Sequence, residues 1–176
     1  MALFKNDQFV SDPWRTLAEG EGISAAGHVI LPLNWWLQER EAFAGSHAKL
    51  GVLMEPDDDL AALQADLPQL SLIALDFPKF GDGRAFSMAA LLRTRHGFKG
   101  ELRAVGEVLF DQLQHMQRCG FDAFDIKDEA TLRALQAGKR PGVGHFYQPA
   151  RDSSSIDQAL REVPAGTRPW LRQPAG

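Results

Sequence analysis

Five short apolar runs, each followed by a segment with helical periodicity, restrict the fold of this chain more than any other feature. The runs occupy residues 28–33, 49–54, 70–75, 101–106 and 121–126. About five consecutive βα units of this kind predict an α/β domain with a mostly parallel sheet and helical crossovers. Both an open three-layer sheet and a partial βα barrel satisfy the pattern, because periodicity does not reveal the order of the strands.

The segments between the apolar runs have the end signals of helices, with acidic residues or asparagine at the start and glycine at the end. We expect helices over residues 34–45, 57–67, 86–97, 107–120 and 128–138. Asn34 is the expected N-cap of the first helix. The fourth has an apolar stripe at near-helical spacing that should face the sheet, formed by Val108, Leu109, Leu113 and Met116.

The two ends of the chain differ from this repeating pattern. Residues 1–26 are expected to form an irregular segment, in which LFKNDQFV at 3–10 could make a short hairpin. We expect a single α/β domain over residues 1–148, since a chain of 176 residues with 44% hydrophobic content suits one core. Residues 149–176 are expected to form a short helix, at 156–163, and a mobile tail rich in Pro, Gly and Arg.

Charge and hydropathy argue against several classes of protein. The formal net charge of −4 argues against general nucleic-acid binding, which needs basic surface to displace counterions. No segment approaches the roughly 20 apolar residues of a membrane-spanning helix, and the first residues lack a secretion signal. We therefore expect a cytoplasmic protein whose partner is neither nucleic acid nor membrane.

The cysteine and histidine residues predict no metal site. The single cysteine, Cys119, rules out an internal disulfide and any cysteine-rich zinc or iron–sulfur site built by this chain alone. It lies at the C-terminal end of a predicted helix, where the dipole opposes a thiolate, so we expect a packed and unreactive thiol. The five histidines lack the spacing of metal ligands.

The connection after the third apolar run, DFPKFGDGRAFS at residues 76–87, is the candidate site. Ligands of parallel α/β sheets bind at the carboxyl ends of the strands, where this connection begins. Its glycines could turn backbone N–H groups toward one ligand, its cations could hold an oxyanion, and the following helix adds the positive end of its dipole. The candidate ligands for phosphate, sulfate or sulfite are Lys79, Gly81, Gly83, Arg84 and Ser87.

A tight turn is the alternative interpretation of this connection, with Asp82 and Arg84 paired on the surface. Neither the Walker pattern nor GxGxxG is present. Other polar residues near predicted strand ends could support a site, namely Asp76, Arg103, Glu107 and Asp111. Arg103 lies inside the fourth strand, where an unpaired charge would be costly. An ion pair with Asp76 and a contact with a ligand both stay open for it.

Three segments together resemble the bacterial DUF934 family, namely FPKFGDGRAFSMAALLR, GELRAVGEVLFDQL and RCGFDAF. The resemblance extends over roughly residues 10–148. Gly81, and Ala85 with Phe86, depart from the family pattern, in which a hydroxyl residue precedes DGR and a tyrosine often precedes the serine. This departure weakens a role for hydroxyl chemistry in the loop.

Members of this family are typically encoded beside the sulfite reductase hemoprotein and are described as oxidoreductases involved in sulfite reduction. The resemblance therefore implies an accessory protein of sulfite reduction, within sulfate assimilation and cysteine biosynthesis. The sulfite reductase hemoprotein is the expected partner. Siroheme and the iron–sulfur cluster would belong to that partner, and we expect no cofactor bound by this chain, in which no redox centre can be recognised.

Two other functions stay open beside the accessory role. One is a small enzyme of the same pathway that binds an oxyanion or a phosphate ester in the glycine-containing loop, and the other is a purely structural module. Copurification with the hemoprotein would favour the accessory role, whereas an anion bound with Arg84-dependent affinity would favour the enzyme. Catalytic residues, if the chain has them, cannot be assigned.

Overall fold

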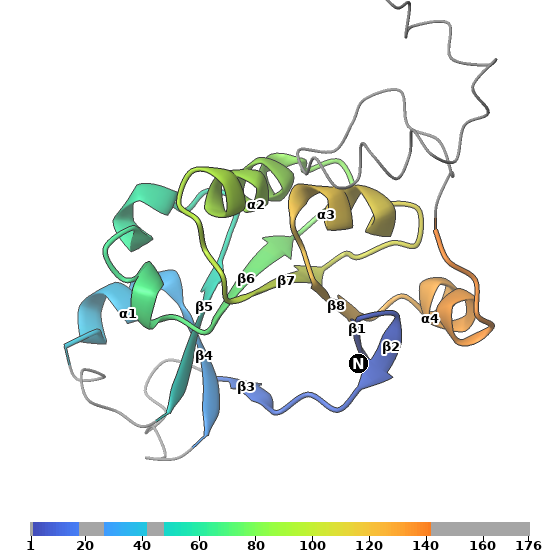
Figure 1. Cartoon of the computed structure of the whole chain (residues 1–176), viewed down its shortest axis with the longest axis horizontal. Coiled ribbons are helices and arrows are strands. Elements are labelled where there is room, and N and C mark those ends of the chain that lie inside the picture. Colours follow the sequence, from blue (N-terminus) through green and yellow to red (C-terminus); the bar gives the residue numbers. More distant parts are fainter. Residues whose placement is uncertain (1, 18–26, 42–47, 142–176) are drawn as a thin grey trace, which may run out of the picture. The chain divides into compact units, whose positions relative to one another are not determined.

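The computed structural model describes residues 2–17, 27–41 and 48–141 (Figure 1). Within these ranges eight strands form one sheet in the order β2-β1-β8-β7-β6-β5-β4-β3. The strands are β1 (Ala2–Lys5), β2 (Gln8–Val10), β3 (Trp14–Thr16), β4 (His28–Pro32), β5 (Lys49–Met54), β6 (Leu72–Phe77), β7 (Glu101–Gly106) and β8 (Ala123–Ile126). The α-helices are α1 (Leu33–Glu39), α2 (Arg84–Thr94), α3 (Leu113–Cys119) and α4 (Glu129–Gln136), and the 3₁₀ helices are η1 (Leu60–Leu63) and η2 (Leu67–Gln69).

The sheet is mixed, so the expected α/β class is confirmed while the expectation of a mostly parallel sheet is corrected. From β3 to β8, neighbouring strands are parallel and follow one another in chain order. β1 is instead antiparallel to both of its neighbours, β2 and β8. It joins β2 through Asn6 and Asp7, whose φ angles of 51° and 60° fit a tight hairpin turn that these residue types tolerate.

Residues 2–17 therefore contribute three strands to the sheet instead of an irregular segment, and the expected hairpin is one part of them. Residues 18–26 of the expected irregular segment lie outside the described residues. Each of these strands has only three or four residues, too few for a periodic signal in the sequence. β1 is completed by pairing with β8, in a register that sets Ala2 opposite Ile126. A contact between such distant residues leaves no local pattern.

The sheet curls because its two edge strands are neighbours in the chain. β2 and β3 lie at opposite edges and are joined by only Ser11, Asp12 and Pro13. The four Cα–Cα steps from Val10 to Trp14 span at most about 14 Å. In a flat sheet, seven interstrand spacings would separate the edges by about 34 Å. The strands therefore form a curled half-barrel (Figure 1).

The two faces of the half-barrel have different surroundings. The outer face packs against the helices in the main core, which includes Val52 and Leu75 from strands and Trp36, Leu92 and Met116 from helices. On the inner face, Ile30, Leu72 and Ala74 form a smaller cluster packed against Trp14, Leu53 and Val105. The central strands are thus apolar on both faces, as their nearly continuous hydrophobic runs predict.

The second expected helix, over residues 57–67, is not an α-helix. Instead η1 and η2 occupy the region from Leu60 to Gln69, with a turn between them. Pro68 lies in η2 and has no N–H for an α-helical ladder. The buried Asp66 carboxylate accepts hydrogen bonds from Trp36 Nε1 at 2.9 Å and from Gln69 Nε2 at 3.0 Å, which stabilises the turn.

Helix α1 begins one residue before its expected cap. Its first residue is Leu33, and the preceding Pro32 makes no side-chain capping bond. Asn34 lies inside the helix, where its Oδ1 accepts the N–H of Trp35 at 2.8 Å. The expectation that Asn34 is the N-cap is therefore wrong.

Helix α3 is shorter than expected, because it begins at Leu113 and the residues from Glu107 to Gln112 form a loop and a turn. Most of the apolar stripe is nevertheless buried. Val108 precedes the helix and Met116 lies within it, and each is at most 1% exposed, as is Leu113. Leu109, the fourth residue of the stripe, is only partly buried, so the expected burial is confirmed for Val108, Leu113 and Met116.

The C-terminal expectations fall outside the described residues. These are the short helix at 156–163, the mobile tail and the domain limit at residue 148. Within the described ranges, no helix is long and apolar enough to cross a membrane.

Candidate functional site

The loop DFPKFGDGRAFS crosses from the carboxyl end of a strand to the start of a helix, as expected. β6 ends at Phe77, and α2 begins at Arg84. Between them, the N–H of Asp82 donates to the carbonyl of Lys79 at 3.0 Å and closes a turn. Lys79 and Gly81 are exposed. The loop therefore lies at the carboxyl ends of the parallel strands, where ligands of α/β proteins bind.

Arg84 is paired with two carboxylates of its own chain. Its Nε donates to Asp82 Oδ1 at 3.0 Å, its Nη2 to Asp82 Oδ2 at 2.7 Å, and its Nη1 to Asp57. Hydrogen bonds from Arg84 lower the pKa of Asp82 to about 2. Hydrogen bonds to Asp82 and Asp57 raise the pKa of Arg84. The surface pair of Asp82 and Arg84 is thus present, and an oxyanion would have to compete with it.

The start of α2 also interacts with the carboxylate of Asp82. The N–H of Arg84 donates to Asp82 Oδ1 at 3.2 Å. Gly83 is the N-cap and has a φ of −91°, and the φ of Gly81 is not positive either. Neither glycine adopts the left-handed conformation that the anion site was expected to use. Ser87 is exposed in the first turns of α2 and does not form the N-cap.

The segment before α3 supports the backbone of the loop. The N–H of Phe80 donates to the carboxylate of Glu107, and Gln112 Nε2 donates to the carbonyl of Phe80 at 3.4 Å. The N–H of Glu107 in turn donates to the carbonyl of Phe77 at 2.7 Å. Asp111 is exposed in the same segment. The backbone of Phe80 is therefore held on both sides, while the residue as a whole is 55% exposed.

Arg103 belongs to the inner face of the half-barrel, with its side chain only 4% exposed. Its Nη1 and Nη2 donate to the Asp12 carboxylate at 2.6 and 3.0 Å, and its Nε and Nη2 donate to Glu101 Oε1 at 2.9 and 2.7 Å. Burial alone would lower the pKa of Arg103, but these hydrogen bonds outweigh burial and raise the pKa. The ion pair therefore forms with Asp12 and Glu101, not with Asp76.

Asp76 packs against the next strand of the half-barrel. A Cβ atom on Gly106 would approach its Oδ1 to 2.5 Å, so the carboxylate lies directly against β7. Burial raises the pKa of Asp76, and Lys127 opposes this change. Burial also raises the pKa of Asp125 on β8, whose Oδ2 lies 3.9 Å from Lys127 Nζ. Lys127 is thus the cation that acts on both Asp76 and Asp125.

The expected site residues consequently fall into two groups. The loop group contains Lys79, Gly81, Gly83, Arg84 and Ser87, with Glu107 and Asp111 in the supporting segment. Asp76 and Arg103 lie in the sheet, where other charged residues surround them.

Residues 51–156 match a family described as a bacterial protein of unknown function, DUF934. The chain belongs to the DUF934 family. The DUF934 match begins in β5 and includes the loop, α2, β7, α3, β8 and α4. It leaves out β1 to β4 and Asp12, although the resemblance was expected from about residue 10. No curated protein matches the chain.

Three acids that pair with the expected cations were not anticipated, namely Asp12, Asp57 and Glu101. Asp12 and Asp57 are distant in sequence from the arginines that they contact, so no local pattern indicates them. Glu101 is two residues before Arg103 on the same strand. Because side chains of a strand alternate between faces, the spacing of two could have identified this partner.

In this DUF934 protein Cys119 is the last residue of α3, at the C-terminal end of a helix as the sequence predicted. It is half-buried, and its Sγ lies 3.9 Å from His115 Nε2. Among the residues that the structure describes, no group of three His, Cys, Asp or Glu side chains is placed to hold a metal ion.

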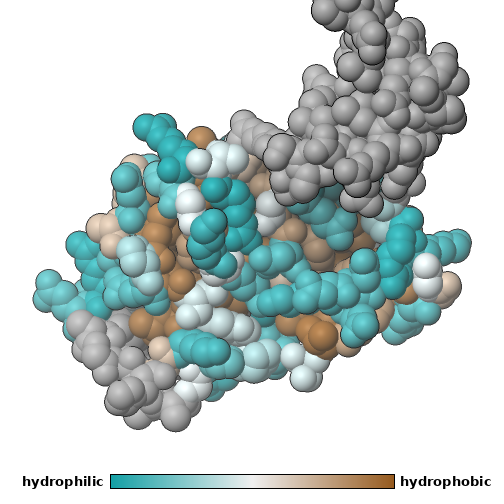
Figure 2. All heavy atoms as spheres, viewed as in Figure 1, coloured by the Kyte–Doolittle hydropathy of each residue, from teal (hydrophilic) through white to brown (hydrophobic). Residues whose placement is uncertain are grey.

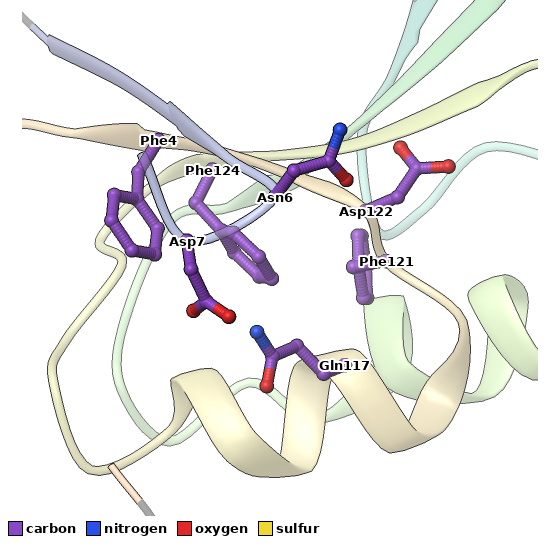
Figure 3. A pocket seen from close by; sticks show the side chains of 7 residues that line it. All are labelled: Phe4, Asn6, Asp7, Gln117, Phe121, Asp122 and Phe124. Carbon is purple, nitrogen blue, oxygen red and sulfur yellow. The ribbon is translucent and has the colours of Figure 1, made fainter. Parts of the chain in front are cut away.

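A pocket of about 280 Å³ opens beside the β1–β2 hairpin and α3 (Figure 3). We call it the hairpin pocket, and its lining residues are Phe4, Asn6, Asp7, Gln117, Phe121, Asp122 and Phe124. A second cavity of about 220 Å³ shares Phe4, Asp7 and Gln117 with it. No sequence motif indicated either cavity, because the walls come from opposite ends of the described chain.

Proposed function

We propose that this DUF934 protein is a cytoplasmic accessory protein of assimilatory sulfite reduction that acts with the sulfite reductase hemoprotein, in the route to cysteine. The siroheme and the iron–sulfur cluster of that partner would carry the oxidoreductase chemistry, and this chain would bind no cofactor itself. The proposal is supported by the resemblance of three segments to proteins encoded beside that hemoprotein.

The exposure of Phe80 supports a docking role for the loop. The residue is 55% exposed, although its backbone is held by Glu107 and Gln112. Aromatic side chains are frequent anchors of protein interfaces, and a loop that is already ordered loses little entropy when a partner binds. The face drawn in Figure 2 has both hydrophilic and hydrophobic areas. Phe80 is the most exposed of the large apolar residues in the described part of the chain, and such a residue on a supported loop favours a binding surface.

The alternative, an enzyme that binds an oxyanion in this loop, has less support from the geometry. Arg84 already donates to Asp82 and Asp57. Asp82 also accepts the first N–H of α2, so its negative charge lies where an anion would bind. An oxyanion would have to displace this carboxylate and would then rely on Lys79. We therefore rank the accessory role first.

A pull-down of the tagged full-length chain tests the accessory role. Cells should grow on sulfate as the sole sulfur source, and the eluate should be analysed for the hemoprotein and for siroheme absorbance. We expect copurification with the wild-type chain and a loss of about tenfold with Phe80→Ser. Leu91→Ser is the matched control, because Leu91 is an exposed apolar residue of α2. If the hemoprotein is absent from the wild-type eluate, the proposed partner is wrong.

Growth of a deletion strain separates the accessory role from the oxyanion enzyme. We expect the deletion to impair growth on sulfate and on sulfite but not on cysteine. Arg84→Lys should restore growth, because a lysine can still pair with Asp82, whereas Phe80→Ser should not. Failure of Arg84→Lys alone would favour the oxyanion enzyme, since lysine lacks the planar fork that holds an oxyanion. Equal growth of the deletion strain on all three sources would contradict both functions.

A further inference from the structure

Three charged residues are buried in the described part of the chain, namely Asp66, Arg103 and Asp125. The side chains of Asp66 and Arg103 each form several hydrogen bonds. Asp125 is 9% exposed, but within the described residues its carboxylate accepts no hydrogen bond, and its ion pair with Lys127 is long, at 3.9 Å. A buried carboxylate without hydrogen bonds costs free energy and is rare, so Asp125 is the exception among the buried charges.

Asp125 lies on the inner face of the half-barrel, in one row with Asp76. Ala123 pairs with Arg103 of the inner face, and Asp125 is two residues further along β8, so it shares that face. Val105 is likewise two residues beyond Arg103, and it pairs with Asp76. Asp76, Val105 and Asp125 therefore form a row across β6, β7 and β8, which we call the carboxylate row.

The two aspartates of the carboxylate row can contact one ligand. Their strands are two apart, about 10 Å between backbones, and side chains converge on the inner face of a curled sheet. Asp76 leans over the strand between them, because a Cβ atom on Gly106 of β7 would lie 2.5 Å from its Oδ1. Lys127 already acts on both carboxylates. A single cationic group can therefore interact with the two acids together.

The inner face is filled around Arg103 and accessible at the carboxylate row. One layer toward the amino ends of the strands, the side chain of Arg103 is 4% exposed and Ala74 is 1% exposed. Asp76 and Val105 are partly exposed, and so is Leu53 of β5. Barrels of parallel strands likewise have a filled interior and bind ligands at the carboxyl ends. A ligand at the row would meet two carboxylates beside aliphatic surface.

The charge of the carboxylate row favours a monocation. Asp76 and Asp125 bring two negative charges, whereas Lys127 brings one positive charge and has a side chain that is 52% exposed. Arg103 is neutralised by its own acidic partners, and the N-terminus acts on Asp125 more weakly than Lys127 does. A metal ion would lack ligands, since in the described ranges no three His, Cys, Asp or Glu side chains are placed to hold one.

We infer that the carboxylate row binds a primary ammonium group carried on an aliphatic chain. The three N–H donors of an ammonium point in different directions and can reach carboxylates on two strands, whereas the planar guanidinium fork suits a single carboxylate. The aliphatic chain would lie against Leu53 and Val105. This inference is independent of the proposed role in sulfite reduction.

NMR titration of the full-length chain with butylammonium at neutral pH tests the inference. We expect saturable shifts of the backbone amides of Val105 and Ile126, and none with butanol, which has the same chain without the charge. Asp125→Asn should weaken butylammonium binding about tenfold, the value of one hydrogen bond to a charged group. Glu39→Gln is the matched control, because Glu39 is an exposed acid at the end of α1, and its affinity should be unchanged.

Loss of binding in Asp125→Asn would not reflect loss of the fold. The variant keeps the shape of the side chain and removes a buried charge, so a thermal melt should show a stability at least equal to that of the wild type. A carboxylate that costs stability is expected where function requires it. Equal affinity of Asp125→Asn and the wild type, or no saturable shifts in the wild type, would overturn the inference.

A second variant tests the sign of the ligand charge. Lys127→Gln removes the cation that acts on both acids and should strengthen butylammonium binding several-fold, whereas weaker binding would contradict the inference. Butyrate has a chain of similar length and the opposite charge, and should give no saturable shifts in the wild type. Saturable shifts with butyrate that Lys127→Gln abolishes would show an anion site and overturn the inference.

A small amine and a lysine side chain of a polypeptide both carry the ammonium group, and they differ in their contacts beyond the row. Acetyl-Gly-Lys-Gly-amide presents the same group and chain on a polypeptide backbone. Tighter binding of this peptide than of butylammonium would assign a lysine side chain of a partner. Equal or weaker binding of the peptide would assign a small aliphatic amine.

Discussion

Asp12 and Arg103, which are 91 positions apart in the chain, form a two-point ion pair on the inner face of the half-barrel. Asp12 lies in the three-residue connection between the two edge strands, and Arg103 lies on β7 near the middle of the sheet. The pair therefore ties the connection that closes the curl to the strand opposite it.

Removal of Asp12 should destabilise the domain. Breaking a buried ion pair by removal of one partner typically costs about 3–5 kcal/mol, because the other charge stays buried. Since Glu101 still pairs with Arg103, we expect about 2–3 kcal/mol for Asp12→Ala in urea unfolding. Asp57→Ala is the control, because Asp57 pairs with Arg84 at the surface, and a surface pair contributes little. Equal losses in the two variants would contradict the structural role of Asp12.

Leu113 should contribute strongly to the main core. Its side chain is 1% exposed in α3 and packs in the core between the helices and the sheet. We expect Leu113→Ala to lower the free energy of unfolding by about 2–5 kcal/mol, the usual cost of emptying a buried leucine site. Leu91→Ala on α2 should have a much smaller effect, because Leu91 is 42% exposed. A denaturant melt that shows no loss in Leu113→Ala would place α3 away from the core.

Gly106 should tolerate no side chain. Its φ is +86°, and a Cβ atom there would lie 2.5 Å from Asp76 Oδ1 and from the Phe77 carbonyl oxygen. The left-handed conformation alone costs an L-residue about 1–2 kcal/mol, so Gly106→Ala should lose at least about 2 kcal/mol in a thermal or urea melt. Gly81→Ala is the matched control, since nothing lies within 4 Å of its added Cβ atom. A comparable loss in both variants would rule out this explanation.

Asp125 should make stability depend on pH. Burial raises its pKa, with Asp12 acting in the same direction, and Lys127, Arg103 and the N-terminus acting against it. A carboxyl whose pKa is higher in the folded state binds its proton more tightly there, so ionisation costs stability as the pH rises from its ordinary pKa of 3.8 through the raised value.

The isosteric change Asp125→Asn removes this ionisation. We expect the variant to gain stability relative to the wild type as the pH rises from about 3, with the gain levelling off above the raised pKa. Urea unfolding of both proteins across this range measures the difference. A difference that is constant or that shrinks with rising pH would contradict the raised pKa.

Local patterns in the sequence were sufficient for the strands β4 to β8 and for the path of the loop at residues 76–87. Apolar runs such as 72–75 must be buried wherever they lie, and glycines and charged residues mark the connections between them. The same reasoning indicated that the charge of Arg103 would be costly if it lay unpaired inside a strand. Glu101 lies two residues earlier on the same strand. Side chains two residues apart lie on the same face of a strand, so Glu101 can pair with Arg103.

Tertiary structure decided which partners these residues have. The antiparallel β1, the partner Asp12 of Arg103 and the partner Asp57 of Arg84 all depend on contacts between residues far apart in the chain. Of these contacts, the pair of Asp12 and Arg103 depends on the curl of the sheet, because Asp12 lies in the short connection between β2 and β3. Sequence periodicity reports the burial of each segment, but the order and curl of the strands determine which segments meet.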